Sequence, residues 1–112
     1  MRRETVIEMP EFQRRAKAAM TEADREALID LLSANPQAGV SLGGGLHKVR
    51  FARQGGGKSG GLRTIHYYKP DEGPVFLLTM FAKNEKSNLT LKETHLLVQL
   101  GQAIATEYGK RK

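Results

Sequence analysis

The chain of 112 residues contains no cysteine and no tryptophan. Without cysteine it has no disulfide, no thiolate zinc site and no cysteine nucleophile, a composition that fits a reducing cytoplasm. No stretch approaches the run of about 20 apolar residues that a membrane helix needs. The opening residues, MRRETVIEMPEF, lack the long apolar segment of a signal peptide. We therefore expect a cytoplasmic protein with no membrane association, and one domain over residues 1–112.

Acidic side chains are missing from the middle of the chain. Residues 40–69 contain no Asp or Glu, and their basic residues are Lys48, Arg50, Arg53, Lys58, Arg63 and Lys69. The flanking parts are nearly neutral, so this segment accounts for the net charge of +6. A basic segment without interspersed acids is typical of a surface that binds a polyanion. The alternative is a solvated loop that only keeps the protein soluble.

The hydrophobic pattern predicts a compact α+β domain. The expected elements are a strand over 4–9, helices over 10–20 and 21–36, strands over 46–53, 62–68 and 74–82, and a helix over 90–109. We expect the first two helices to form a hairpin and the last strand to be central, because its apolar run shows little alternation.

The ends of the longer helices carry recognisable signals. Thr21 can cap the second helix, with Asp24 three residues on, and Thr90 and Glu93 have capping-box spacing. The apolar residues expected to face the core are Ala27, Leu28, Leu31 and Leu32 in the second helix, and Leu97, Leu100 and Ile104 in the last.

The glycine-rich stretch RQGGGKSGGLR, residues 53–63, contains Gly-Lys-Ser and raises the question of a nucleotide-binding loop. The first glycine of that motif would fall at position 52, which is Ala52, and a predicted strand follows where the motif needs a helix. The sequence therefore argues against a nucleotide-binding loop. Two interpretations remain: a flexible hairpin loop, and a basic loop that places Lys58 against a phosphodiester backbone.

Two segments resemble the RelE/HigB family of type II toxin–antitoxin toxins. They are GGLHKVRFARQGGGKSGGLRTIHYY and FLLTMFAKNEKSNLTLKE, in that order and at that spacing, and with the strand–helix–helix start the likeness covers nearly the whole chain. The resemblance implies a RelE-like fold, with a mainly antiparallel sheet and a C-terminal helix. It also implies a small ribonuclease that enters the ribosomal A site and cuts messenger RNA. A cognate antitoxin, typically with a helix-turn-helix DNA-binding domain, would neutralise it.

Transesterification of RNA needs a deprotonated 2′-hydroxyl, a stabilised phosphorane and a protonated 5′-oxygen. With no cysteine and no evident metal cluster, we expect metal-independent, cofactor-free catalysis by basic side chains. The expected catalytic residues are Lys48, Arg50, Arg63, Lys83 and Lys86, and the resemblance implies that Arg63 clamps the transition state. The expected RNA contacts are Arg53, Lys58, His47, His66, Asn84 and Tyr68.

Some positions depart from the family pattern. In the best-known members an aromatic that stacks on the substrate base lies where this chain has Thr90, and an Arg lies near Asn84. Stacking would then come from Tyr67 or Tyr68, of which at least one is expected in the core because adjacent strand residues face opposite sides. His47 and His66 are either general-base candidates or packed structural residues. Other readings of the chain are a noncatalytic nucleic-acid-binding module and a gyrase-poisoning toxin on the same fold.

Overall fold

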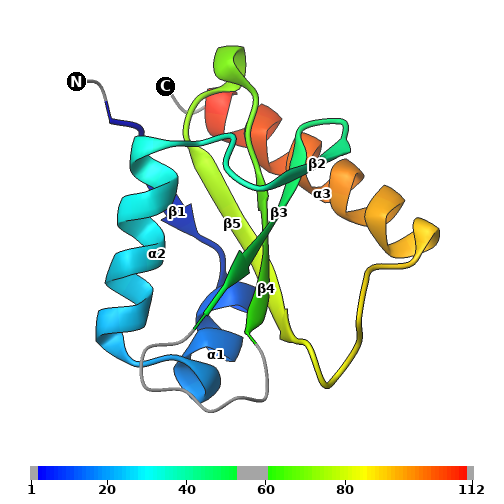
Figure 1. Cartoon of the computed structure of the whole chain (residues 1–112). Coiled ribbons are helices and arrows are strands. Elements are labelled where there is room, and N and C mark those ends of the chain that lie inside the picture. The colour runs from blue at the N-terminus through cyan, green and yellow to red at the C-terminus, as the bar shows by residue number, and fades with distance from the viewer. Residues whose placement is uncertain (1–2, 53–60, 111–112) are drawn as a thin grey trace.

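A computed structural model describes residues 3–52 and 61–110. Arg53 and Lys58, two predicted RNA contacts, lie outside the described residues. The elements are β1 (Val6–Glu8), α1 (Pro10–Ala19), α2 (Glu22–Ala34), β2 (Val40–Gly43), β3 (Leu46–Phe51), β4 (Leu62–Tyr67), a 3₁₀ turn (Pro70–Glu72), β5 (Val75–Ala82) and α3 (Leu91–Lys110). The predicted α+β class and the order of its helices are confirmed (Figure 1).

The strands form a five-stranded sheet in the order β1-β5-β4-β3-β2. The edge strand β1 runs parallel to its neighbour β5, and the pairs β5–β4, β4–β3 and β3–β2 are antiparallel. β5 lies between β1 and β4 and is almost entirely buried, as its apolar sequence predicts. The expectation of a mainly antiparallel sheet is therefore correct.

The edge strand β2 is an element that the sequence pattern does not predict. It pairs with β3 through the two-residue turn Gly44-Gly45, whose φ angles of 61° and 93° are left-handed. A tight hairpin favours such angles at both central positions, and glycine adopts them without a Cβ clash. The strand is hard to recognise because its residues are mostly exposed, with Val40 at 60%.

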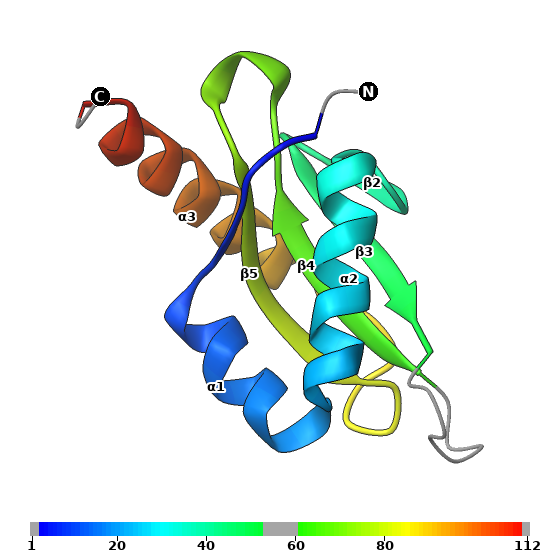
Figure 2. The same ribbon diagram turned by 90° about the vertical axis from the view of Figure 1, so that its left-hand side faces the viewer.

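Helices cover both faces of the sheet (Figure 2). On one face, α1 and α2 pack through Phe12, Ala16, Leu28 and Leu32 against strand residues such as Val49 and Leu62. On the other face, α3 packs through Ala105 and its partly buried neighbours against Leu46, Ile65, Tyr67, Phe76 and Phe81. We call these the α1/α2 face and the α3 face. None of the helices in the described residues is long and apolar enough to cross a membrane.

The capping predictions hold, and part of the predicted core does not. Thr21 and Asp24 form a capping box at α2, and Thr90 and Glu93 exchange the corresponding bonds at the start of α3. The helices meet the sheet over narrower stripes than their sequences suggest. For that reason Ala27 and Leu31 of α2 and Leu100 of α3 are exposed rather than buried.

Candidate nucleic-acid interface

Three of the predicted basic residues project from neighbouring strands on the α3 face. Lys48 and Arg50 alternate with Val49 along β3, and Val49 belongs to the core beneath α1 and α2. Since successive side chains of a strand point to opposite faces, Lys48 and Arg50 point to the α3 side. Arg63 of β4 shares its face with Ile65, a residue of the α3-side core. Strand pairing therefore brings these cations together.

Arg50 and Arg63 stand directly opposite each other in the β3–β4 ladder. Side chains in such positions have Cβ atoms about 4.5–5.5 Å apart, and like charges there repel. Arg50 is exposed, and Arg63 is only 8% exposed. No hydrogen bond or ion pair joins either side chain to a described residue. Among the described residues, the buried side-chain nitrogens and oxygens without a hydrogen-bond partner are Nδ1 of His47 and Nδ1 of His66. The Arg63 nitrogens have no described partner either but are not in that set, so they keep contact with solvent.

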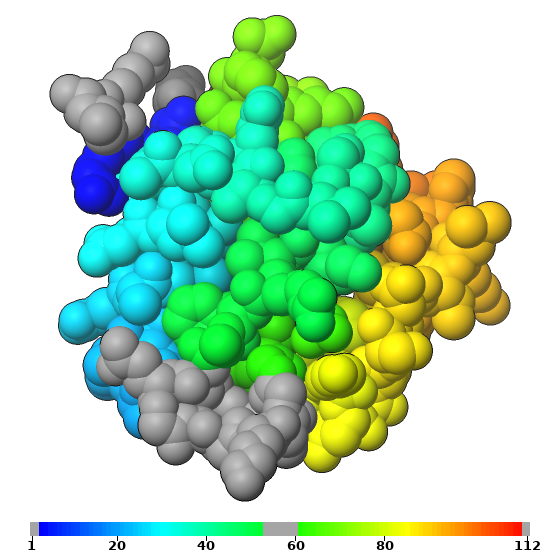
Figure 3. Space-filling view, in the orientation of Figure 1, coloured from blue at the N-terminus to red at the C-terminus, as the bar shows by residue number. Residues whose placement is uncertain are grey.

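Lys48 is held by the segment between β5 and α3, residues 83–90. Its Nζ donates to Oδ1 of Asn88 over 2.9 Å. The same Oδ1 accepts the backbone N–H of Leu89 over 3.1 Å, which fixes the direction of the amide. Because Asn88 is uncharged and no described carboxylate pairs with Lys48, the lysine is oriented without a counter-charge from the described part of the chain. The segment forms the surface between β3 and the first turns of α3 (Figure 3).

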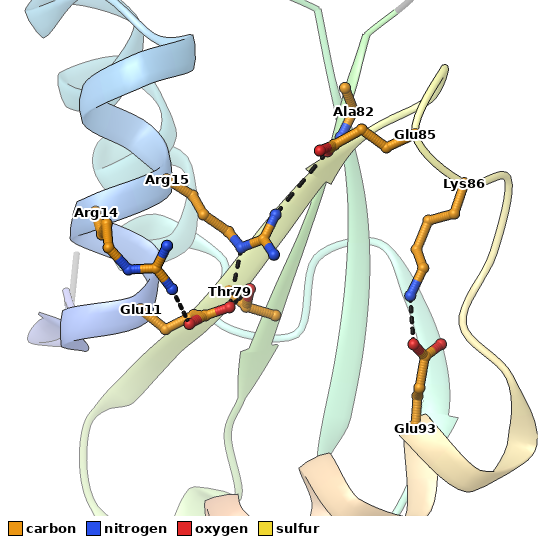
Figure 4. Close-up of polar contacts among 8 residues, drawn as sticks. All are labelled: Glu11, Arg14, Arg15, Thr79, Ala82, Glu85, Lys86 and Glu93. Carbon is orange, nitrogen blue, oxygen red and sulfur yellow. Dashed lines mark hydrogen bonds and ion pairs between the residues drawn. The ribbon is translucent and has the colours of Figure 1, made fainter.

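Lys86, from the same segment, contacts the β5 residue that is paired with Arg63. Its Nζ is 5.6 Å from the ring centroid of Phe81, the β5 residue opposite Arg63. It also forms an ion pair with Oε2 of Glu93 in the first turn of α3 (Figure 4). The other carboxylate oxygen of Glu93 accepts the Thr90 N–H over 2.8 Å. The contact with Lys86 and, next, the one with Thr90 lower the pKa of Glu93. We call Lys48, Arg50, Arg63 and Lys86 the basic surface.

Lys83 and Asn84 follow directly after β5, and both are exposed. The backbone N–H of Lys83 donates to the carbonyl oxygen of Gly61 over 3.3 Å. This contact places the turn next to the start of β4, at the end of the sheet where Arg63 lies. Lys83 and Asn84 therefore border the basic surface.

A groove of about 370 Å³ lies between α1, β5 and α3. Its floor is apolar and includes Met80, Phe81, Leu89, Leu96 and Leu97. On the α1 rim, Arg15 Nε donates to Glu11 over 2.9 Å, and a second Arg15 nitrogen is 3.9 Å from Glu85 (Figure 4). The hydrogen bond from Arg15 lowers the pKa of Glu11. Lys86 and Glu93 form part of the opposite rim, so this groove borders the basic surface.

The structure does not bring the predicted histidine contacts to the basic surface. His47 and His66 are cross-strand partners on the α1/α2 face, with ring centroids 5.0 Å apart. His47 is 8% exposed and His66 is fully buried, with its Nε2 2.7 Å from the carbonyl oxygen of Pro36. Burial lowers the pKa of both, that of His66 to about 4. We therefore correct their assignment from RNA contacts to packed residues.

Tyr68 is also on the wrong face for the predicted stacking role. It is partly buried against the α1/α2 core, and its hydroxyl donates to Glu4 over 3.2 Å. Tyr67 is fully buried on the α3 face, where its hydroxyl donates to Glu72 over 2.6 Å. Neither tyrosine is thus placed to stack on a base at the basic surface.

Two polar residues of this surface are absent from the predicted site. Asn88 orients Lys48, and Glu93, recognised from sequence only as a helix cap, also neutralises Lys86. A signal for Glu93 is present in the capping box itself, because the box uses one carboxylate oxygen and leaves the other for a cation. Asn88 has no comparable signal, since its contact with β3 spans 40 residues.

Residues 5–111 match the family described as "RelE toxin of RelE / RelB toxin-antitoxin system". The match spans nearly the whole chain and includes every residue of the basic surface. The chain belongs to the RelE toxin family, as its sequence motifs predict. It is accordingly the toxin of a toxin–antitoxin system, with a cognate antitoxin as its partner.

Proposed function

We propose that this toxin is an endoribonuclease that cleaves messenger RNA in the ribosomal A site and thereby inhibits translation. The observation that carries the proposal is the Arg50–Arg63 pair, which has no carboxylate partner among the described residues. Two like charges held opposite each other disfavour the folded state. A phosphodiester bound between them would accept hydrogen bonds from both and compensate both charges.

Within this proposal Arg63 clamps the scissile phosphate. Its backbone lies in β4, between β3 and β5, so the guanidinium starts from a fixed position. A planar guanidinium donates two parallel hydrogen bonds to phosphate oxygens and can stabilise the charge that develops in the phosphorane. Arg50 and Lys48 bind the same or the next phosphate, and Lys83 and Lys86 extend the contact toward α3. Charge stabilisation is thus assigned to side chains rather than to a metal ion.

Proton transfer is the least complete part of the site. His47 and His66 are on the opposite face, so neither can take the proton of a 2′-hydroxyl bound at Arg63. Lys48, whose ammonium is oriented by Asn88 on the same face of β3 as Arg50, is the candidate for proton exchange. An incomplete acid–base set supports a requirement for the ribosome, which would align the 2′-oxygen with the phosphorus.

The antitoxin is proposed to act on the same surface. We assign it a helix-turn-helix DNA-binding domain and an acidic segment that covers Lys48, Arg50 and Arg63. Such a segment would compensate the charges that RNA otherwise compensates, which makes the two ligands mutually exclusive.

Primer extension on a defined transcript tests the proposed activity. The transcript is incubated with the purified toxin either free or programmed into ribosomes, and we expect cuts only on ribosomes. Equal cleavage of the free transcript would contradict ribosome dependence. RNA binding without cleavage in either setting would support a noncatalytic module, and DNA linearised in the presence of gyrase would support the gyrase-poisoning alternative.

A further inference from the structure

Residues 83–93 supply the acceptors for two lysines of the basic surface, Lys48 and Lys86, and the two acceptors differ in charge. Lys48 donates to the neutral amide of Asn88, whereas Lys86 pairs with the charged carboxylate of Glu93. Both acceptors are fixed by a backbone N–H, that of Leu89 for Asn88 and that of Thr90 for Glu93. The structure therefore presents one cation with its charge available and one with its charge cancelled.

The position of Lys86 makes this cancellation relevant to RNA. Its ammonium lies 5.6 Å from the centroid of Phe81, which stands opposite Arg63 in the ladder. The Lys86 and Glu93 side chains are 36% and 40% exposed, so water and solutes reach the pair. Ion pairs that exposed are weak and exchange readily. A flexible lysine stem also lets the ammonium move without any change in the backbone.

We propose that Glu93 is an internal counter-ion that occupies Lys86 in the free toxin and yields it to an RNA phosphate on binding. Glu93 is then a positioning residue that lowers the affinity for RNA and limits its salt dependence, and it does not touch the reacting atoms. This inference rests on the proposed function, because it requires RNA at the basic surface. Throughout the exchange Glu93 retains its bond from the Thr90 N–H, so the start of α3 stays capped.

The exchange has a direct effect on the acidity of Glu93. In the free toxin the ammonium of Lys86 is the first cause of its lowered pKa, and the Thr90 N–H is the second. When RNA takes Lys86, the first cause is lost and a phosphate anion comes near. Both changes favour the protonated carboxyl, so RNA binding raises the pKa of Glu93.

Anisotropy of a labelled single-stranded RNA measures the affinity part of the inference. The RNA carries 2′-O-methyl groups, so it cannot be cleaved, and the dissociation constant is measured across a salt series. Glu93→Gln keeps an acceptor for the Thr90 N–H and so preserves the capping box. We expect it to bind about two- to fivefold tighter at low salt, the range that corresponds to releasing an exposed ion pair. We also expect the slope of log K against log salt to steepen by up to about 0.7, the value for one further phosphate contact on a single strand.

A double-mutant comparison separates the exchange from a general charge effect. In a Lys86→Met background, Glu93→Gln should leave RNA affinity unchanged, because no ammonium is left to release. Glu26→Gln removes one negative charge from an exposed position on α2 and should also have no effect. An equal gain from Glu93→Gln with and without Lys86, or the same gain from Glu26→Gln, would overturn the inference.

Carbon-13 NMR of the Glu93 carboxyl, titrated with and without saturating 2′-O-methyl RNA, provides the second readout. We expect the pKa of Glu93 to be higher in the complex, and an unchanged value would overturn the inference. Arg63→Met is measured beside these variants. If it binds RNA as well as the wild type does, the proposed function itself fails. If it binds weakly and Glu93→Gln has no effect, only the counter-ion role fails.

Discussion

Arg50 of β3 lies directly opposite Arg63 of β4, and neither side chain has a partner of opposite charge among the described residues. Arg25 of α2 is different, because it contacts the carboxylate of Glu8 on β1 at 2.6 and 3.1 Å and is 21% exposed. The pair with Glu8 ties a helix to the sheet. The pair of arginines serves no such purpose, which is why we assign it to a ligand.

This difference predicts opposite effects on stability. Arg63→Met removes like-charge repulsion while keeping an apolar stem of similar length, and we expect the free energy of unfolding to stay the same or rise by up to about 1 kcal/mol. Arg25→Met leaves Glu8 without its partner and should cost about 1.5–3 kcal/mol. Urea unfolding followed by circular dichroism measures both. A loss at Arg63→Met as large as that at Arg25→Met would show that Arg63 supports the fold.

Alanine substitutions at two glycines of α3, Gly101 and Gly109, should have opposite effects on stability. A Cβ at Gly101 would lie 2.3 Å from Cδ1 of the buried Tyr67 ring, whereas one at Gly109 would meet nothing within 4 Å. Alanine favours a helix interior over glycine by about 1 kcal/mol. We therefore expect Gly109→Ala to be neutral or slightly stabilising and Gly101→Ala to cost about 1–3 kcal/mol by overpacking. Thermal unfolding of the two variants would contradict this if Gly101→Ala melted at or above the wild-type temperature.

Much of the fold follows from local sequence, because its signals are short-range. Thr21 and Thr90 cap their helices through residues three positions on, and the apolar run of β5 indicates burial on both faces. β2 is not predicted because an exposed edge strand needs no apolar alternation. Its pairing depends on β3 and on the conformation of Gly44 and Gly45.

The site is only partly predictable for a similar reason. Alternation places Lys48 and Arg50 on one face of a strand, and this much is visible in the sequence. The same alternation puts His47 on the opposite face, yet only the packing of α1 and α2 shows that this face is buried. The contact between Lys86 and Glu93 depends on how the 83–90 segment folds back toward α3, which no local pattern determines.

Because His66 is buried, we expect the stability of the folded protein to depend on pH. Burial is the largest cause that lowers the pKa of His66, and the charge of His47 lowers it further. The bond to the Pro36 carbonyl acts in the opposite direction but is outweighed, so the pKa falls from 6.5 to about 4. Between these values the unfolded chain binds more protons than the folded one, so stability decreases as the pH falls from about 6.5 to about 4. At 1.36 kcal/mol per pKa unit, His66 alone accounts for a loss of about 3 kcal/mol.

Urea unfolding of His66→Gln at a series of pH values checks this assignment. Glutamine can still donate to the Pro36 carbonyl but does not titrate, so its stability should change less with pH over that interval. His95→Gln, at an exposed position of α3, is the matched control and should retain the wild-type slope. Equal slopes for wild type and His66→Gln would place the acid sensitivity elsewhere.

Binding of the antitoxin should respond to salt through the same surface. If acidic residues cover Lys48, Arg50 and Arg63, electrostatic steering accelerates association at low ionic strength. Stopped-flow measurement from low to high salt should show a falling association rate constant, with a shallower fall for Arg50→Met. A rate constant that does not change with salt would instead indicate a mostly apolar interface.

Single-turnover cleavage of messenger RNA on programmed ribosomes tests the central claim, that the Arg50–Arg63 pair binds the reacting phosphate. Removing one fixed donor of developing charge typically lowers the rate of the chemical step by about 10²–10³. We expect a loss of this size for Arg63→Met, a smaller loss for Arg50→Met because its exposed side chain is less fixed, and wild-type folding by circular dichroism in both. A folded Arg63→Met that cleaves at the wild-type rate would contradict the assignment of this pair as the phosphate site.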